Sequence, residues 1–490
     1  MSSPSSPINK ETMDASAAHL LTLGIAFITL VASIFKLATR RPCDRRKTPI
    51  KVSDASIARI ALIDHADAFC NRPMPAFPAG RPVTHSIASM PYGPLWRALR
   101  CNLTSDMLNR SRLGILTSLE KEADAALVTN LSSLTCSDDV AVRNVLHSGV
   151  FALVSRLCFG EDGMDACDLS TLMKMQQEFF SSYVKVKQAS ERSWLTKLLH
   201  WRQRRLQTGM FDRIDEVFIP AIVAIRRRRL CQQDDNCNGG FRSYLDSLIE
   251  LNVPDQEDGE HARRSRLLTD KEIAFLAWEF LGAGISGTVT SLEWTLAHLA
   301  VQPEIQNKLH DELAGDHASD VLRLPYLHAV VLESLRMHPP LPFASRQVVT
   351  AEGITAALGE SSSVMIPPGG AAVSFVLGDI GRDGKVWTNP DEFRPERFME
   401  GGEGEGVSLV PGPKEIKMMP FGVGRRHCLG VGMGMAHIKC FLAELVREFR
   451  WLLASPDDGG GNGGVDFTEL DGFIKWMKTP LRVRITPRAR

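Results

Sequence analysis

The sequence predicts a mainly helical fold with small β-sheets, and three observations support this fold class. Apolar residues recur at the 3.6-residue period of a helix through most of residues 111–230, where glycine is rare. A second, strongly apolar helical stretch of about 30 residues, or roughly 45 Å, follows residue 269. Short runs rich in β-prone residues lie at Ser345–Thr350, Ser363–Ile366, Ala371–Phe375 and Leu481–Ile485.

Composition narrows the classes of function. The 490 residues include 57 Lys and Arg and 57 Asp and Glu, so the formal net charge is zero and no nucleic-acid partner is expected. Ten cysteines are too few for a disulfide scaffold in a chain of this length. No CxxC pair indicates a zinc site, so we expect most of the cysteines to be reduced core residues.

Residues 1–47 are predicted to hold a membrane anchor. Ala15–Phe35 is a run of 21 residues without formal charge, long enough as a helix to cross a hydrocarbon layer of about 30 Å. A cleaved signal peptide is the alternative. The flank before the run is not basic, whereas Lys36–Lys47 after it is rich in arginine and lysine. This asymmetry favours an uncleaved, single-pass anchor that leaves residues 48–490 in the cytosol as one domain.

A helix is predicted to begin near Leu95, after a short helix-like segment at Ile57–Phe69. Trp96 and Arg100 lie four residues apart on it and therefore share one face. An indole N–H and a guanidinium group that project together can bind a carboxylate. A packed surface pair is the alternative.

Trp194–Leu206 combines tryptophan and leucine with lysine and arginine at helical spacing. This pattern predicts a basic amphipathic helix. It is typical both of a helix that lies on a membrane surface and of a solvated helix face, and the sequence leaves both interpretations open.

The long apolar helix is predicted to begin at a capping box, with Thr269 as N-cap and Glu272 three residues later. A helix this long and apolar must cross the interior. Gly282, Gly284 and Gly287 interrupt it, each at a cost of up to about 1 kcal/mol relative to alanine. We therefore expect a bulky partner to approach closely or the helix to bulge locally. Glycines tolerated at a helix crossing are the alternative.

Another helix is predicted from Pro325 to just before Pro339. Glu333 and Arg336 lie three residues apart on it, so one carboxylate can meet this arginine and a second one from elsewhere. Alone, such a pair is a common helical ion pair. Glycine-rich pieces at 401–406 and 459–464 are expected to be flexible surface insertions.

Cys428 lies between two glycine-rich turns and just before an apolar, helix-like run at Val431–Leu445. Free backbone N–H groups and the helix dipole favour a negative charge there, so we expect a lowered pKa for this thiol and a role as metal ligand. Arg426 offers a planar fork of donors to a carboxylate. A buried structural cysteine is the alternative.

The spacing Phe421-x-x-Gly424-x-Arg426-x-Cys428-x-Gly430 resembles the haem-binding loop of the cytochrome P-450 superfamily. Two upstream elements of that family, Glu-x-x-Arg and Pro-x-Arg-Phe, are matched at family-like intervals. They supply the expected structural residues Glu333, Arg336 and Arg397. The resemblance covers the chain from about residue 73 onward and implies the cytochrome P-450 fold, here with an N-terminal membrane-anchor helix.

The resemblance also implies the cofactor. Haem b (iron protoporphyrin IX) would have Cys428 as its proximal iron ligand. Further haem contacts are implied for Trp96, Arg100, Ala283, Gly284, Arg346, Phe421, Gly424, Arg426 and Gly430.

The implied activity is a monooxygenase that inserts one oxygen atom of O2 into a hydrophobic small molecule. The chain carries no flavin or nucleotide motif, so electrons from NADPH would come through NADPH–cytochrome P-450 reductase on the same membrane. The sequence is most similar to plant microsomal members, particularly the groups numbered 77 and 89. This similarity implies the endoplasmic reticulum membrane as the location, with the catalytic domain in the cytosol.

Two departures from the family pattern stand out. In the long helix the usual acid is replaced by Ser286 and the following threonine by Gly287, so Ser286 and Thr288 are the candidate catalytic residues for proton delivery. No proline-rich hinge or first strand is expected between Thr48 and Ile57. These departures keep two alternatives open: a reductase-independent haem-thiolate isomerase or lyase that acts on a peroxide, and a degenerate, non-catalytic haem protein.

Overall fold

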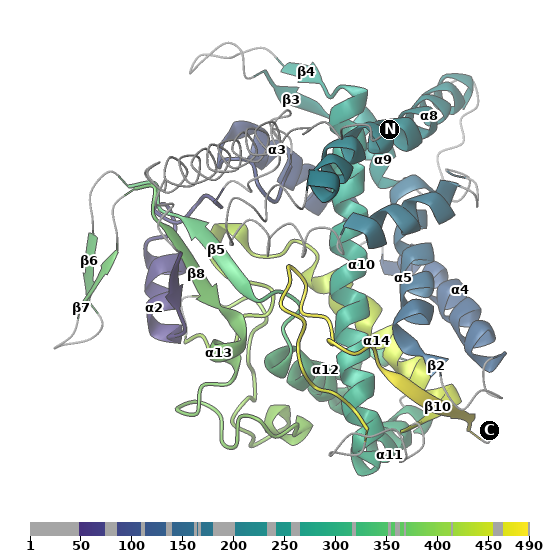
Figure 1. Ribbon diagram of the computed structural model, residues 1–490, viewed down its shortest axis with the longest axis vertical. Coiled ribbons are helices and arrows are strands. Elements are labelled where there is room, and N and C mark those ends of the chain that lie inside the picture. Colours follow the sequence, from purple (N-terminus) through teal and green to yellow (C-terminus); the bar gives the residue numbers. More distant parts are fainter. Residues whose placement is uncertain are drawn as a thin grey trace, which may run out of the picture. The chain divides into compact units, whose positions relative to one another are not determined.

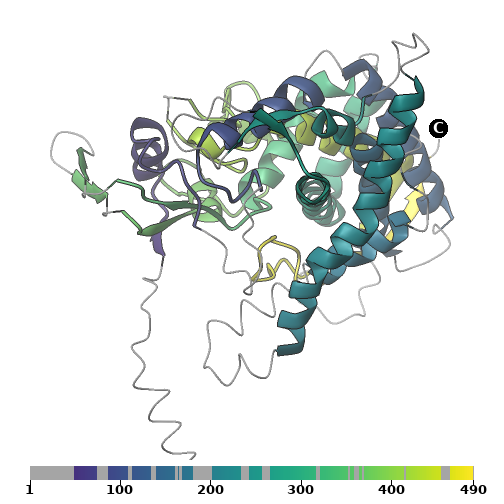
Figure 2. The ribbon, with the colours of Figure 1, turned by 90° about the horizontal axis from the view of Figure 1, so that it is seen from above.

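Helix α10 (Asp270–Val301) is the element around which the other helices pack in this computed structural model. It begins with the predicted capping box: the Glu272 N–H donates to the Thr269 hydroxyl, and the Thr269 N–H donates to the Glu272 carboxylate. Figure 1 shows α10 running lengthwise through the helical part, and Figure 2 shows the same helix from its end.

The structure describes residues 49–73, 86–108, 113–133, 140–160, 164, 168–179, 201–232, 242–255, 265–315, 320–350, 354–357, 363–366, 369–412, 415–453 and 464–488. The predicted anchor lies outside these residues, and so does most of the basic amphipathic segment. Among the described helices, α10 is the one long and apolar enough to cross a membrane by length and composition. It is mostly buried inside the protein, as the core helix of a soluble domain also is.

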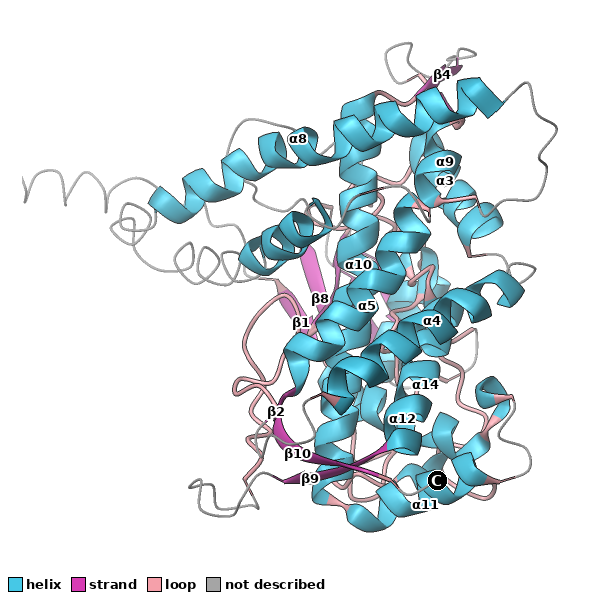
Figure 3. Cartoon of the chain, turned by 90° about the vertical axis from the view of Figure 1, so that its right-hand side faces the viewer, coloured by secondary structure: helices cyan, strands magenta, loops and turns pink. Residues whose placement is uncertain are grey.

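Helices from many parts of the chain pack against α10. They are α5 (Val142–Phe159), α8 (Trp201–Gln232), α9 (Tyr244–Ile249), α11 (Pro303–Ala314), α12 (Pro325–Met337) and α14 (Val431–Glu448). Helix α4 (Leu113–Ser132) packs against α5, and Figure 3 shows these two helices next to each other. The prediction of several helices between residues 111 and 230 is thus confirmed for the described part of that range.

The first sheet has the order β1–β8–β5. Strand β8 (Ala372–Val376) pairs antiparallel with β5 (Phe343–Gln347) and parallel with β1 (Ile50–Val52). The expectation of no strand between Thr48 and Ile57 is therefore wrong. Three residues are too few to display an alternating pattern, and β1 becomes recognisable only where it adds to the edge of β8.

The second sheet has the order β2–β10–β9 and lies at the far end of α10 from α8 (Figure 3). Its strands are β2 (Val140–Ala141), β9 (Phe449–Leu453) and β10 (Arg482–Pro487). Two hairpins complete the described strands: β3 (Asn252–Pro254) with β4 (Ser265–Leu267), and β6 (Ile354–Ala357) with β7 (Ser363–Ile366). Of these seven strands, β7 and β10 were predicted.

Short helical elements connect the larger ones. They are α2 (Ala55–Arg59), α3 (Pro94–Asn102) and α13 (Leu377–Gly381), the π-helical turns Ile60–Asp64 and Leu103–Met107, and the 3₁₀ turns Val321–Arg323, Pro395–Phe398 and Gly424–Arg426. The start of α3 agrees with the helix predicted near Leu95, and Pro94 occupies the first turn, where proline is favourable.

One of the three glycines in α10 allows a close helix crossing. A Cβ atom on Gly284 would lie 2.9 Å from a Cγ atom of Val154 on α5, so α5 approaches α10 closely there. The helix remains α-helical throughout and does not bulge. At Gly282 and Gly287 a Cβ atom would meet no other residue within 4 Å. The expected close approach therefore holds at one position, and the other two glycines face open space.

The glycine-rich piece at 401–406 is not a free insertion. The Gly404 N–H donates to the Arg397 carbonyl oxygen over 2.7 Å, and the Glu403 carboxylate pairs with the Arg397 guanidinium group. The segment is a series of turns that covers a buried arginine, so the prediction of a flexible surface insertion is wrong at this place.

Candidate functional site

The cysteine loop is shaped by tight backbone turns. The Cys428 N–H donates to the Phe421 carbonyl oxygen over 2.9 Å, which closes the loop. Gly424 has φ of +75°, and a Cβ atom there would lie 2.2 Å from the Leu62 carbonyl oxygen. Glycine is therefore required at position 424 for its backbone conformation and for its close approach to the helical turn Ile60–Asp64.

The Cys428 side chain is accessible to solvent, although protein atoms surround most of the thiol. Burial raises the pKa of the Cys428 thiol, while the Gly430 N–H and the charges of Arg72 and Arg100 oppose that rise. The expectation of a lowered pKa is therefore wrong for the protein alone, because desolvation outweighs the helix N-terminus. A metal ion bound to such a thiol would deprotonate it.

Four arginines gather near Cys428, and we call them the arginine cluster: Arg72, Arg100, Arg346 and Arg426. Burial lowers the pKa of each, and with a smaller contribution from neighbouring arginines the pKa is about 9 for Arg346 and about 10 for Arg100 and Arg426. For Arg72 the charges of Glu279 and Cys428 oppose the effect of burial on its pKa. Arginine stays protonated in proteins, so these shifts mean that the charged groups are held in an unfavourable environment. Within the described residues, no member of the arginine cluster forms an ion pair.

Backbone carbonyl groups hold the arginine cluster in place. Arg426 donates to the Cys70 and Met90 carbonyl oxygens, each over 2.7 Å, and its guanidinium group lies 4.5 Å from the centroid of the Trp96 ring. Arg346, on strand β5, donates to the Val423 carbonyl oxygen over 3.1 Å. These contacts place residues distant in sequence on one side of the cysteine loop.

Trp96 and Arg100 share a face of α3, as their spacing predicts. Arg100 donates to the His427 carbonyl oxygen over 3.0 Å, directly beside Cys428. The Trp96 indole N–H donates to the Ile87 carbonyl oxygen over 3.0 Å. The tryptophan N–H therefore already has a protein partner, and the pair does not present two free donors together.

Sequence reasoning missed Arg72. It follows the bridge residue Asn71, and it donates to the Ala88 carbonyl oxygen over 3.2 Å and to the Arg426 carbonyl oxygen over 3.4 Å. No spacing relation links Arg72 to the cysteine loop, so no local signal identifies it.

The middle of α10 borders open space. Ala283 is exposed within a helix that is otherwise mostly buried. Ser286 and Thr288, the candidate catalytic residues, are both buried. The Thr288 hydroxyl donates to the Gly284 carbonyl oxygen over 2.9 Å, one helical turn back. Thr288 is thus engaged by its own helix.

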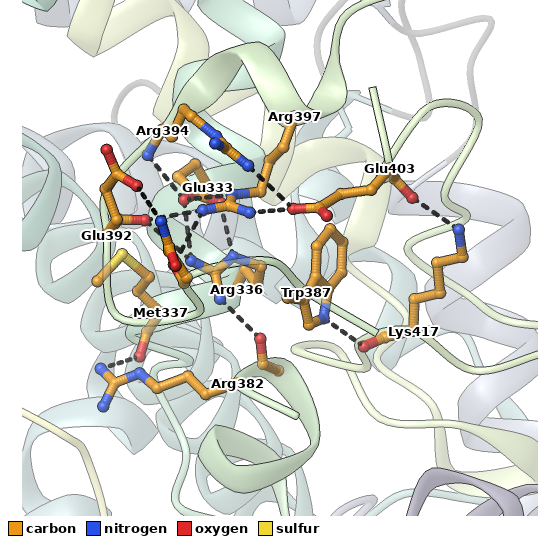
Figure 4. A network of polar contacts seen from close by, with 12 residues as sticks. Glu333, Arg336, Met337, Arg382, Trp387, Glu392, Arg394, Arg397, Glu403 and Lys417 are labelled. Carbon is orange, nitrogen blue, oxygen red and sulfur yellow. Dashed lines mark hydrogen bonds and ion pairs between the residues drawn. The ribbon is translucent and has the colours of Figure 1, made fainter. Parts of the chain in front are cut away.

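Glu333, Arg336 and Arg397 form the centre of a second polar group, which we call the glutamate network (Figure 4). Both Glu333 oxygens are used, by Arg336 at 2.6 and 2.9 Å and by Arg397 at 2.9 Å, and all three side chains are fully buried. The Trp387 ring lies 5.3 Å from the Arg336 guanidinium group and 6.0 Å from that of Arg397. The glutamate network joins α12 to the turn at Pro395–Phe398.

A family model of cytochrome P450 matches residues 45–460 of the chain. The chain belongs to the cytochrome P450 family. It is 33% identical to cytochrome P450 89A9 of Arabidopsis thaliana over 91% of this chain and 85% of the relative. It is 29% identical to a 2-hydroxyisoflavanone synthase of Glycyrrhiza uralensis, over 77% and 71% of the two chains. The predicted resemblance, including that to the group numbered 89, is confirmed.

A zebra fish cytochrome P450 solved with abiraterone shares the fold, with a TM-score of 0.66 over 90% of this chain and 93% of that chain at 23% identity. The mainly helical cytochrome P450 fold with small sheets is therefore confirmed. The chain is an enzyme of a family whose members are generally haem-thiolate monooxygenases, and the family implies haem as cofactor.

The residues present fit a haem. Cys428 offers the soft sulfur ligand that iron accepts in this family. The arginine cluster supplies positive charges that form no ion pair within the described part of the chain, which suits the two carboxylates of a haem. Ala283 and Gly287 border open space without bulky side chains, so the middle of α10 can lie close to a flat ring.

Proposed function

We propose that this cytochrome P450 is a haem-thiolate monooxygenase that inserts one oxygen atom of O2 into a hydrophobic small molecule. The observation that carries the proposal is the placement of the Cys428 thiol beside Arg72 and Arg100, members of a cluster that forms no ion pair within the described residues. Haem bound there would supply the oxygen-activating chemistry. Cys428 would hold the iron, and the arginine cluster would bind the haem carboxylates.

The residues of α10 would handle protons beside the haem. Ser286 and Thr288 are the hydroxyl groups of the segment in which the family pattern has an acid and a threonine. The Thr288 hydroxyl donates its hydrogen bond to the Gly284 carbonyl oxygen. Thr288 can therefore pass its proton to another group only if that hydrogen bond breaks. We expect Ser286, or water beside Gly287, to deliver protons less effectively than an acid, with more hydrogen peroxide released.

The electrons would come from NADPH through NADPH–cytochrome P450 reductase. Basic residues at the exposed end of the cysteine loop and on α3 offer a docking face for such a partner. Arg425 there donates to the Tyr92 hydroxyl over 2.8 Å and pairs with Asp67, while Arg97 is exposed. With Ala15–Phe35 as anchor, this face would lie on the cytosolic side of the endoplasmic reticulum membrane.

A reductase-independent isomerase or lyase that acts on a peroxide is the second candidate. The observation that favours it is the replacement of the acid and threonine in α10 by Ser286 and Gly287, since a peroxide substrate brings its own activated oxygen. A degenerate haem protein has less support, because β1 is present where the sequence suggested a loss.

The test begins with the carbon monoxide difference spectrum of the reduced, purified protein. A thiolate-type band is expected, and its absence would refute haem-thiolate binding. Turnover is then measured in three mixtures: NADPH with reductase, a fatty-acid hydroperoxide alone, and neither. Substrate-dependent NADPH consumption supports the monooxygenase, whereas hydroperoxide conversion without reductase supports the second candidate.

A further inference from the structure

Glu279, on α10, binds a segment that lies far from it in sequence. Its Oε1 atom accepts hydrogen bonds from the Ser86 hydroxyl over 2.7 Å and the Ala88 N–H over 2.8 Å. Its Oε2 atom accepts the Ile87 N–H over 2.9 Å. Three donors converge on one carboxylate, and together they fix the backbone of residues 86–90, which we call the 86–90 segment.

The carbonyl groups of the 86–90 segment point to the haem site. The Ile87 carbonyl oxygen accepts the Trp96 indole N–H over 3.0 Å and an Arg426 N–H over 3.2 Å. The Ala88 carbonyl oxygen accepts an Arg72 N–H over 3.2 Å. Members of the arginine cluster thus donate hydrogen bonds to carbonyl groups whose orientation depends on the backbone of this segment.

A single peptide unit links Glu279 to the arginine cluster. The Ile87 carbonyl and the Ala88 N–H belong to the same planar trans peptide, so they point in opposite directions. When Glu279 accepts the Ala88 N–H, the Ile87 carbonyl is directed at Trp96 and Arg426. A carboxylate at one end of this peptide also polarises it and strengthens the hydrogen bonds at the other end.

We propose that Glu279 is a positioning residue: its carboxylate fixes the 86–90 segment, and this segment holds the arginine cluster in place for the carboxylates of the haem. The charges agree with this role. The Glu279 carboxylate and the Arg72 guanidinium group attract each other, so Glu279 also acts directly on one member of the arginine cluster. Burial raises the pKa of Glu279, and its three donors together with Arg72 oppose that rise.

The test uses Glu279→Gln in the haem-loaded protein and rests on the proposed haem binding. Two quantities are measured, the reduction potential of the haem and the rate at which the haem transfers to an excess of apomyoglobin. We expect a more positive potential, because removal of a negative charge favours the reduced iron, and roughly tenfold faster haem loss. The matched control is Glu293→Gln. Glu293 is a buried glutamate on the same helix, and it pairs with Arg143 at 2.8 Å rather than with a member of the arginine cluster.

Both quantities must change relative to the control. A potential or a haem-loss rate equal to that of Glu293→Gln would overturn the proposal. If Glu279→Gln does not fold, Ser86→Ala removes one donor and keeps the charge. Faster haem loss at an unchanged potential is then expected, and wild-type haem loss would overturn the proposal. A wild-type protein without a thiolate-type carbon monoxide band would instead refute the proposed function.

Discussion

The arginine cluster and the glutamate network are both groups of buried or half-buried guanidinium side chains, but they differ in whether carboxylates of the protein pair with them. In the glutamate network, Arg336 and Arg397 share the two oxygens of Glu333, and Glu403 also pairs with Arg397. In the arginine cluster, carbonyl oxygens are the acceptors and no ion pair forms within the described residues. The glutamate network is complete within the protein, so it holds the fold, whereas the arginine cluster suits carboxylates supplied by a ligand.

The strongest way to break this comparison is Cys428→Ser, which removes the proposed iron ligand beside the arginine cluster. We expect loss of the thiolate-type carbon monoxide band and a fall in turnover of at least about a hundredfold, since even residues that only support a metal ligand are worth 10–100-fold. Cys101→Ser, at an exposed cysteine, is the control and should leave both unchanged. Unchanged pigment and turnover in Cys428→Ser would refute the assignment of the site.

Glu333→Gln should break the glutamate network. Arg336 would lose the carboxylate that it pairs with, and Arg397 one of the two that it pairs with, so we expect a loss of about 3–5 kcal/mol in the free energy of unfolding. Denaturant unfolding measures it. Asp64→Asn removes the exposed pair with Arg59 and should cost about 0–1 kcal/mol. Equal losses in the two variants would contradict the role given to the glutamate network.

Arg346→Met should have the opposite effect on stability. It replaces a buried charge that forms no ion pair with any described residue by an apolar side chain, so the haem-free protein should stay within about 1 kcal/mol of wild type or become more stable. Haem retention should fall, because one donor to the haem carboxylates is lost. Unfolding of the haem-free protein and haem transfer to apomyoglobin measure the two effects. A stability loss as large as that of Glu333→Gln would end the contrast between the two groups.

The smallest effect is expected for Gly287→Thr, which changes the chemistry and leaves both charged groups intact. A Cβ atom at Gly287 meets no other residue within 4 Å, so a side chain can begin there without a clash. We expect about two- to threefold less hydrogen peroxide released per NADPH consumed, because a hydroxyl group is restored for proton delivery. Unfolding should not change. Unaltered peroxide release would show that position 287 does not limit proton delivery.

Local sequence was sufficient to predict a contact where the two residues are close neighbours along the chain. The capping box at Thr269 follows from a three-residue spacing, and so does the pairing of Glu333 with Arg336. The turn around Gly424 is a local backbone requirement, and the spacing from Phe421 to Gly430 was enough to indicate the cytochrome P450 family.

Tertiary structure decided which distant groups meet. Arg72 and Glu279 carry no local signal, since each acts through the 86–90 segment only after folding brings it close. Folding also gave the Trp96 indole N–H a carbonyl partner at Ile87. The pKa of Cys428 could not be predicted from sequence either. The helix N-terminus that lowers this pKa can be identified in sequence, but the burial that outweighs it cannot. Spacing determines what neighbouring residues can do, whereas solvation and long-range contacts exist only in the folded chain.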